Sequence, residues 1–356
     1  MKVIVSGPAD GYSGWSRATE LYILALDSVG INVIPQLYKL NDDPKKTVDR
    51  INDLSTDVDG AEAIIHCGLP HLYSQYSLPQ IGIFFTETDY YGLSHWPGYI
   101  NIMDRAVVPN FQAHKAALDS GINIPIDRIP PPTIPLKEVK PGASNLSEET
   151  NGDFLFYFIG ELSHRKNLGA LIKAFHLEFT PNEPVSLVLK VNKYGLPEEE
   201  IFEATKQKCQ SIKDGLRIRK DYKKEVIISS TMSSDQMLSL HQYCDCLVNT
   251  SFGEAWGFPI IDAIQSGNNV ICNNVGGPAD YLPKEHLCNN YKVPCFGMTD
   301  QFDMLFTGYE NWWEIDINDL RAKMRNAYNC SVVPKVNFYT LESVGNKLKE
   351  SLLKCI

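Results

Sequence analysis

Short apolar runs and amphipathic stretches alternate along this chain. Each apolar run is typical of a strand, and the stretch after it often carries apolar residues at helical spacing. In the first such stretch the spacing runs from Trp15 to Val29, and Gly30 provides a stop signal. Both faces of the short runs are apolar, which is typical of strands buried in parallel sheets. The runs of the first third are residues 3–5, 32–35, 63–68, 81–87 and 105–109.

A second series of the same kind begins after a polar interruption. Pro130 to Pro132 precede residues 137–151, which are polar without periodicity and predict a linker. Strand and helix signals alternate on either side of it, so we expect right-handed βαβ units. The fold class is therefore α/β, with two doubly wound, Rossmann-like domains facing across a cleft, at residues 1–140 and 152–337. The apolar runs of the second series are residues 154–160, 185–191, 225–230, 246–251 and 268–274, and a last amphipathic helix is expected within residues 338–356.

Composition narrows the classes of partner. The 356 residues are 44% hydrophobic and 21% charged, as in an ordinary globular protein, and the formal net charge is -10. Such a charge argues against nucleic-acid binding and leaves at most a peripheral membrane contact. A phosphate-bearing ligand would need a local cluster of cations. The oligomeric state stays open.

The cysteines and the first residues favour a cytoplasmic location. Nine cysteines are scattered without a CxxC pair, which is typical of reduced, buried thiols. The first residues, MKVIVSGPADG, lack the apolar core of a signal peptide, and no apolar run approaches the ~18 residues of a membrane span. No metal is expected, because no HxH, DxD or HExxH cluster lies at a strand end.

The stretch GEAWGFPIID, residues 253–262, combines two acids with two glycines directly after a predicted strand. Pro259 suits the first turn of a helix, so the pattern is strand, glycine loop, helix. Backbone N–H groups at such a helix start favour an anion, and ligands of open parallel sheets bind beyond the carboxyl ends of the strands. Glu254 alone is typical of a solvated loop and Asp262 alone of a first-turn acid, but together they favour a binding site.

Arg165 and Lys166 form the second candidate. They follow the strand at residues 154–160 and precede a predicted helix for which Asn167 is a possible cap. A guanidinium and an ammonium there would hold a diphosphate. Cations oppose the dipole at a helix start, so a bound anion would explain their placement better than a solvated pair.

Weaker signals lie elsewhere. GGPADYL, residues 276–282, either frames a sugar site or is only a turn, and GYSGWSR, residues 11–17, is a glycine loop without the full dinucleotide fingerprint. Glu87 and Asp89 in TETD suit acceptor binding or proton transfer, and equally suit helix capping. His66 ends a strand, where a lone histidine is more often structural.

Four segments of the second half occur together in an order and spacing that resemble one family. The family is the retaining glycosyltransferases of family 4, which have the GT-B fold. The first half resembles it more loosely, through residues 11–26, TETD and residues 108–122, and the helix within 338–356 resembles one that packs back on the first domain. The four segments are FIGELSHRKNLGALIKAF, TSFGEAWGFPIIDAIQSGNNVI, NNVGGPADYL and WWEIDINDLRAKM.

The resemblance implies transfer of a hexose-type sugar from a nucleoside-diphosphate sugar to a glycan or other hydroxyl acceptor, with retained anomeric configuration and no required cofactor. UDP and GDP donors both stay open. The implied catalytic group is Glu254, Arg165 and Lys166, with Asp262 on the ribose hydroxyls. The other implied donor-side residues are Ala255, Trp256, Gly257 and Phe258 along the sugar and phosphates, Gly11 and Gly14 facing the phosphates, and Thr231 near the base; the acceptor-side candidates are Tyr12, Glu87, Asp89 and His66.

Two departures from the family pattern are visible. The second acid is Asp262 where glutamate is usual, and Glu161 stands where many members carry arginine.

Other classes of function remain as alternatives: a nucleotide-sugar epimerase on the same fold, or a non-catalytic protein that binds nucleotide sugars or glycans.

Overall fold

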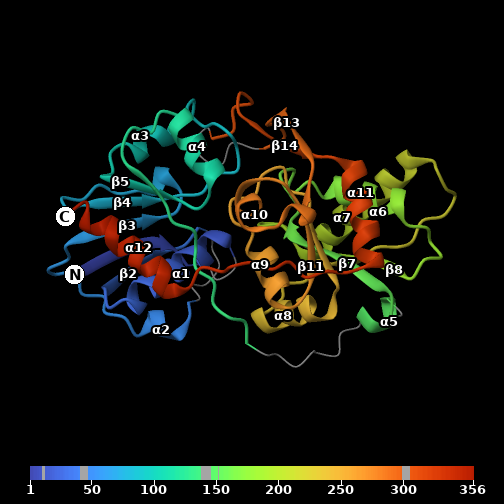
Figure 1. Ribbon diagram of the computed structural model, residues 1–356, viewed down its shortest axis with the longest axis horizontal. Helices are drawn as coiled ribbons and strands as arrows, with labels where there is room; N and C mark the ends of the chain where they lie inside the picture. The colour runs from blue at the N-terminus through green and yellow to red at the C-terminus, as the bar shows by residue number, and fades with distance from the viewer. Residues whose placement is uncertain (10–12, 41–46, 138–145, 151, 299–304) are drawn as a thin grey trace. The chain divides into compact units, whose positions relative to one another are not determined.

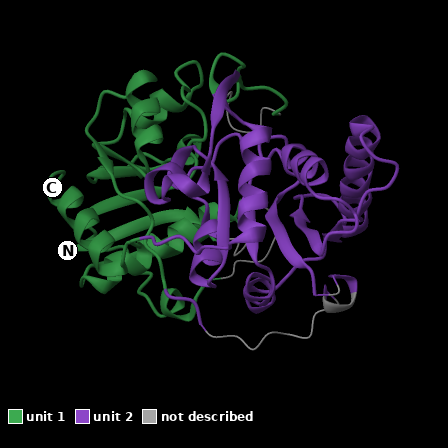
Figure 2. Ribbon diagram, turned by 45° about the vertical axis from the view of Figure 1, so that its right-hand side comes forward, with its two compact units in different colours: residues 1–134, 294–311, 337–356 green, residues 135–293, 312–336 purple. Residues whose placement is uncertain are grey.

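The computed structural model describes residues 1–9, 13–40, 47–137, 146–150, 152–298 and 305–356. It forms two compact units, each discontinuous in sequence (Figure 2). Unit 1 comprises residues 1–134, 294–311 and 337–356, and unit 2 comprises residues 135–293 and 312–336. Residues 294–311, which the sequence places within the range 152–337, thus belong to unit 1.

Unit 1 is built on a parallel sheet with strand order β2-β1-β3-β4-β5-β6. Two central strands are buried along their full length, which agrees with the mostly apolar residues on both of their faces. The strands, drawn in blue to green in Figure 1, are β1 Lys2–Pro8, β2 Asn32–Tyr38, β3 Ala63–Cys67, β4 Gln80–Ile83, β5 Arg105–Val108 and β6 Ile126–Arg128. The helices are α1 Gly14–Ser28, α2 Asp49–Asn52, α3 Trp96–Ile100, α4 Phe111–Asp119 and α12 Leu341–Leu353, with a 3₁₀ turn η1 at Pro70–Leu72.

Helix α12 completes unit 1 by packing against α1 (Figure 1). Its N-cap Thr340 accepts a hydrogen bond from the Ser343 N–H, as capping predicts. A Cβ added to Gly345 would lie 2.1 Å from the carbonyl oxygen of Ala25, so only glycine permits this approach of the two helices. Val344, Leu348 and Leu352 are fully buried in the contact.

Unit 2 repeats the architecture, with the parallel order β12-β11-β10-β7-β8-β9. Its core joins the apolar faces of α6, α7 and α11 to the sheet. The strands are β7 Phe154–Glu161, β8 Val185–Asn192, β9 Val226–Ile228, β10 Cys246–Asn249, β11 Asn269–Asn273 and β12 Leu287–Cys288. The helices are α5 Leu146–Thr150, α6 Leu168–Glu178, α7 Glu198–Leu216, α8 Ser234–Tyr243, α9 Phe258–Gln265, α10 Gly276–Tyr281 and α11 Ile317–Asn329, with a 3₁₀ turn η2 at Lys284–His286. A separate two-stranded sheet pairs β13 Asn290–Pro294 with β14 Asn311–Ile315.

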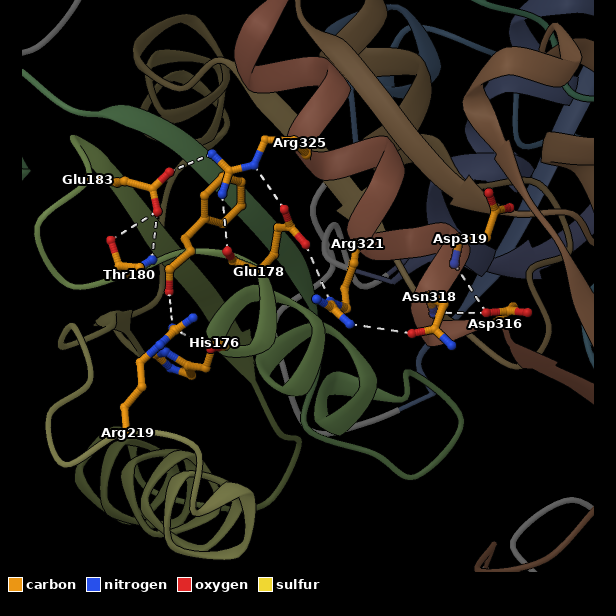
Figure 3. Close-up of polar contacts among 11 residues, drawn as sticks. His176, Glu178, Thr180, Glu183, Arg219, Asp316, Asn318, Asp319, Arg321 and Arg325 are labelled. Atoms are coloured by element: carbon orange, nitrogen blue, oxygen red, sulfur yellow. Dashed lines mark hydrogen bonds and ion pairs between the residues drawn. The ribbon is translucent and has the colours of Figure 1, made fainter.

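An ionic network ties α11 to the end of α6 in unit 2 (Figure 3). Arg325 donates to Glu178 Oε1 at 2.8 Å and to the Glu178 carbonyl oxygen at 3.0 Å, and it also pairs with Glu183. Its guanidinium lies 4.4 Å from the ring centre of Phe179, a cation–π distance. The hydrogen bond and charge of Arg325, together with two hydrogen bonds from Thr180, lower the pKa of Glu183 to about 2, against the opposing effect of burial.

Three features bear on the sequence expectations. The predicted linker contains a short helix, α5, in which the Thr150 hydroxyl donates to the Leu146 carbonyl oxygen. All nine cysteines are free, and seven are buried. Within the described ranges, every helix is too short or too polar to span a membrane.

Candidate functional site

Two turns of unit 2 meet at the carboxyl ends of adjacent strands. The basic turn, residues 163–167, links β7 to α6, and the acid loop, residues 250–257, links β10 to α9. Strands β7 and β10 are hydrogen-bonded neighbours, so their carboxyl ends lie side by side. The Phe252 N–H donates to the Arg165 carbonyl oxygen at 2.8 Å. The backbone itself therefore joins the two turns.

The charged side chains of the two turns are in contact. Lys166 Nζ donates to Glu254 Oε2 at 2.6 Å, and the Arg165 guanidinium donates to the Gly253 carbonyl oxygen at 2.9 Å. The side chains of Lys166 and Glu254 are only 15% and 12% exposed, so solvent screens this pair weakly. Asn249 Nδ2 lies 3.4 Å from the same Glu254 oxygen. A single carboxylate thus faces two cations.

This surrounding keeps Glu254 ionised. Burial alone would raise the pKa of Glu254, but the charges of Lys166 and Arg165 outweigh it, and the hydrogen bonds from Lys166 and Asn249 add to their effect. The pKa of Glu254 is therefore lowered. Two cations thus act on the Glu254 carboxylate from the basic turn.

The rest of the acid loop leads into α9. Ala255 and Trp256 are 7% and 5% exposed, Gly257 is the N-cap of α9, and Phe258 is its first residue. Asp262 lies on α9 itself, half-buried, just beyond the first turn. The structure thus gathers Glu254, Arg165 and Lys166 directly, whereas Asp262 belongs to the helix that follows them.

Helix α10, which begins the GGPADYL segment, supports the acid loop. The Gly277 N–H donates to the Glu254 carbonyl oxygen at 3.1 Å. The Tyr281 hydroxyl donates to the Trp256 carbonyl oxygen at 2.9 Å. These contacts fix the backbone around Glu254, while the framing of a sugar site by this segment stays a prediction.

Thr231 lies apart from the two turns along the sheet. It follows β9, an edge strand, and β8 and β7 intervene between β9 and β10. Thr231 is exposed, and its N–H donates to Glu198 Oε1 at 2.5 Å, at the start of α7. Its predicted place near a nucleotide base remains an expectation from the resemblance.

The candidates of unit 1 are distributed over several elements. Gly14 is the first residue of α1, whose N-cap Ser13 accepts from the Ser16 N–H, while Gly11 and Tyr12 lie outside the described residues. Glu87 and Asp89 follow β4, and both are half-buried. Asp89 Oδ1 accepts from the Asn311 N–H at 2.7 Å, and Oδ2 accepts from the Asn311 side-chain amide at 3.2 Å.

His66 lies inside the sheet of unit 1. It is 2% exposed, its Nε2 is 3.1 Å from Gln80 Oε1, and its ring stacks on Tyr73 with centroids 5.1 Å apart. Burial lowers the pKa of His66, and the Gln80 hydrogen bond only partly opposes this. A neutral, packed histidine agrees with the structural alternative that the sequence left beside the acceptor-side one.

Sequence reasoning missed several residues that touch the two turns. Asn249 and Tyr281 contact Glu254 and its loop, and Glu314 accepts a hydrogen bond from Asn167 Nδ2 at 2.8 Å. Glu314 falls in the segment WWEIDINDLRAKM, which the resemblance included without a role for any residue. Asn167 is the N-cap of α6, as expected, but its side chain does not cap the helix.

A cavity of about 480 Å³ opens beside the basic turn in unit 2. Asn167 and Glu314 line it together with residues of α6, α7 and α11. Among the described residues no group of three or more histidine, cysteine, aspartate or glutamate side chains is arranged to hold a metal ion.

Comparison with known proteins identifies the fold. The chain is similar to sucrose-phosphate synthase from Thermosynechococcus elongatus, with a TM-score of 0.62 and 13% identity over 100% of this chain and 94% of that one. It is similar to Burkholderia xenovorans α,α-trehalose-phosphate synthase (UDP-forming) in complex with glucose-6-phosphate, with a TM-score of 0.64 and 10% identity over 99% and 96% of the two chains. It is also similar to Anabaena HepE in complex with UDP and glucose, with a TM-score of 0.61 and 13% identity over 99% of this chain and 100% of that one. At such low identity the likeness shows the fold alone, which is GT-B: a chain folded into two Rossmann-like domains.

A family model narrows the class further. Residues 143–294 match the family described as Glycosyl transferases group 1, and this range contains both the basic turn and the acid loop. Residues 143–294 therefore carry a glycosyl transferases group 1 domain. None of the curated proteins matches the chain significantly.

Proposed function

We propose that the protein is a retaining glycosyltransferase that transfers a hexose-type sugar from a nucleoside-diphosphate sugar to a hydroxyl of a carbohydrate. The observation that carries the proposal is the contact of Arg165, Lys166 and Glu254 within the glycosyl transferases group 1 domain. Both turns also precede helices, α6 and α9, whose N-terminal N–H groups favour an anion.

The proposed chemistry depends on the leaving group. When the bond from the sugar to the diphosphate breaks, negative charge develops on the phosphate oxygens. Arg165, Lys166 and the helix N–H groups would stabilise that charge, and such preorganised groups usually contribute the largest share of catalysis. Glu254, kept ionised by its neighbours, would accept hydrogen bonds from the donor sugar. Asp262 would accept hydrogen bonds from the ribose hydroxyls of the nucleotide.

Retention is proposed to arise by attack from the face that the diphosphate leaves. The acceptor oxygen then bonds to the anomeric carbon while the bond to the diphosphate oxygen breaks, and the acceptor proton passes to that leaving oxygen. The Lys166 contact commits Glu254 to an ion pair, which makes it a poor nucleophile for a covalent sugar intermediate. Detection of a glycosylated Glu254 by mass spectrometry would contradict this route.

The solved relatives suggest which substrates to test first. Structures of similar fold contain UDP with glucose, or glucose-6-phosphate. We therefore propose a UDP-hexose donor and a sugar phosphate acceptor as the first pair, with GDP donors as the competing set.

The deciding assay measures release of the nucleoside diphosphate from a panel of UDP- and GDP-sugars, with and without sugar phosphates. The expected result is release of the nucleoside diphosphate that depends on the acceptor. NMR of the product should show the same anomeric configuration as in the donor. Lys166→Ala should lower turnover by about 10²–10³, the usual cost of one such group. Lys206→Ala, which removes an exposed lysine paired with Glu203 on α7, should leave it unchanged.

Other outcomes select the alternatives. Conversion of the donor without acceptor would indicate an epimerase. Binding of nucleotide sugars without turnover across the panel would indicate a binding protein. Equal turnover of Lys166→Ala and the native protein would reject the role given to the basic turn.

A further inference from the structure

Strand β14 lies against both turns of the candidate donor site. The Trp313 N–H donates to the Phe252 carbonyl oxygen at 2.9 Å, and the Phe252 N–H donates to the Arg165 carbonyl oxygen at 2.8 Å. Three segments distant in sequence are thus connected in a row by their backbones: the basic turn, the acid loop and β14. Residues 312–315 of β14 belong to unit 2, as do both turns.

A stack of rings fills the space beside these backbones. The rings of Phe252 and Trp312 are nearly parallel, with centroids 4.7 Å apart and an angle of 11° between their planes. His164 stacks on Phe252 at 5.2 Å and lies 5.7 Å from Trp312. Trp312 is fully buried and Phe252 is 3% exposed. Close stacking of this kind is favourable beyond the burial of the rings, so it fixes their relative position.

The members of the stack lie next to the reactive groups in sequence. His164 directly precedes Arg165 and Lys166, and Phe252 lies two residues before Glu254. A shift of either ring would therefore move a charged side chain of the site. Trp312 touches both rings and carries no charge itself, so its position favours a supporting role.

Glu314 holds the other end of the basic turn. Asn167 has a left-handed backbone, with φ 47° and ψ 40°, which is unfavourable for a residue with a side chain. Its amide donates to Glu314 Oε1 at 2.8 Å, and its carbonyl oxygen accepts from the Thr250 hydroxyl at 3.0 Å. These hydrogen bonds compensate the backbone strain next to Lys166.

We propose that Trp312 and Glu314 are positioning residues of the donor site, which hold the basic turn and the acid loop at the separation that lets Lys166 meet Glu254. The inference rests on the proposed function only for its effect on turnover. The positioning itself concerns the contact between Lys166 and Glu254, which is measurable without any substrate.

The substrate-free experiment acylates the folded protein with a small reagent and measures the rate at Lys166 by mass spectrometry of its peptides. In the native protein the ion pair and low exposure protect Lys166. Glu314→Ala and Trp312→Leu should raise the Lys166 rate about three- to tenfold, the scale expected from loss of one stabilising contact. Glu314→Gln retains an oxygen that accepts from Asn167, and it should restore protection.

Two controls separate positioning from general loss of stability. Trp96→Leu removes an equally buried tryptophan, 1% exposed, from the core of unit 1. It should lower the unfolding temperature without changing Lys166 acylation below that temperature. Lys206, an exposed lysine, should react at the same rate in every variant.

The kinetic experiment adds a second readout. A 1 Å displacement of a catalytic group costs up to about 10²-fold in rate, so Glu314→Ala and Trp312→Leu should lower kcat about 10- to 100-fold with the donor KM changed far less. Glu314→Gln should recover most of kcat.

The outcomes distinguish this inference from the proposed function. Unchanged Lys166 acylation in both Glu314→Ala and Trp312→Leu, or a rise that Trp96→Leu reproduces, would overturn the positioning role. A rise reversed by Glu314→Gln would support it, even where the native protein turned over no nucleotide sugar. In that case the proposed function would fail and the positioning role would stand.

Discussion

Replacing Gly276 by alanine should displace the backbone of Glu254. Gly276 has φ +58, and a Cβ there would lie 1.8 Å from the Glu254 carbonyl oxygen, whereas real Cβ contacts stay above 3.0 Å. The obstacle is backbone, so no side chain can rotate away. Either the start of α10 or the backbone of Glu254 has to move by about 1 Å.

The cost has two physical sources. A left-handed backbone costs a residue with a Cβ about 1–2 kcal/mol. Overpacking in a dense interior costs a further 1–3 kcal/mol, approximately. Gly276→Ala should therefore lower the free energy of unfolding by about 2–5 kcal/mol in total. The displacement at Glu254 should in addition reduce turnover by up to about 10²-fold.

Gly267 provides the matched control. It has φ +87 and follows α9, but a Cβ there would meet nothing within 4 Å. Gly267→Ala thus carries the left-handed cost without the collision, and part of that cost is offset because alanine restricts the unfolded chain. Urea unfolding of both variants, with nucleotide-sugar turnover at a temperature where both are folded, isolates the collision. Equal stability and equal turnover of the two variants would refute the reasoning.

The remaining predictions concern the ionic network of unit 2. Arg325→Ala should lower the free energy of unfolding by about 1–3 kcal/mol, because it removes charge-assisted hydrogen bonds to Glu178 and Glu183 that are partly exposed, and urea titration at neutral pH measures this loss. A carboxylate whose pKa is lower in the folded than in the unfolded protein stabilises the fold at pH values above the unfolded pKa, and this stability is lost as the pH falls. The stability contributed by Glu183 should therefore disappear between pH 4.5 and about 2. The difference between native protein and Arg325→Ala should accordingly shrink across that range, and a difference independent of pH would contradict the assignment.

The sequence predicted the sheets well because their signals are local. Continuous apolar runs such as AIIHCG and FLFYFIG became the buried parallel strands β3 and β7. The basic turn and the acid loop were found for the same reason, since each is read from a strand, a turn and a helix start within about twenty residues. Their placement at adjacent strand ends follows from the strand order, which the alternating pattern does not specify.

The residues that support the basic turn and the acid loop could not be predicted, because they contact the turns from distant parts of the sequence. Asn167 was expected to cap α6 with its side chain, which is the common local solution. Its partner is instead Glu314, 147 positions away in sequence, and no local pattern indicates such a pair. The same holds for Trp312 beneath Phe252, and for Gly276 against the Glu254 carbonyl oxygen. Helix α5 was missed because five residues are too few for a periodicity to show.

The packing of α12 on α1 has a consequence for synthesis. Residues 341–353 leave the ribosome only after all of unit 2 has been made, whereas α1 emerges before unit 2. Until then the α1 surface that Val344, Leu348 and Leu352 later cover stays open to water. Unit 1 is therefore complete only once α12 has been made, and the apolar surface of α1 that stays exposed during that interval is prone to aggregation.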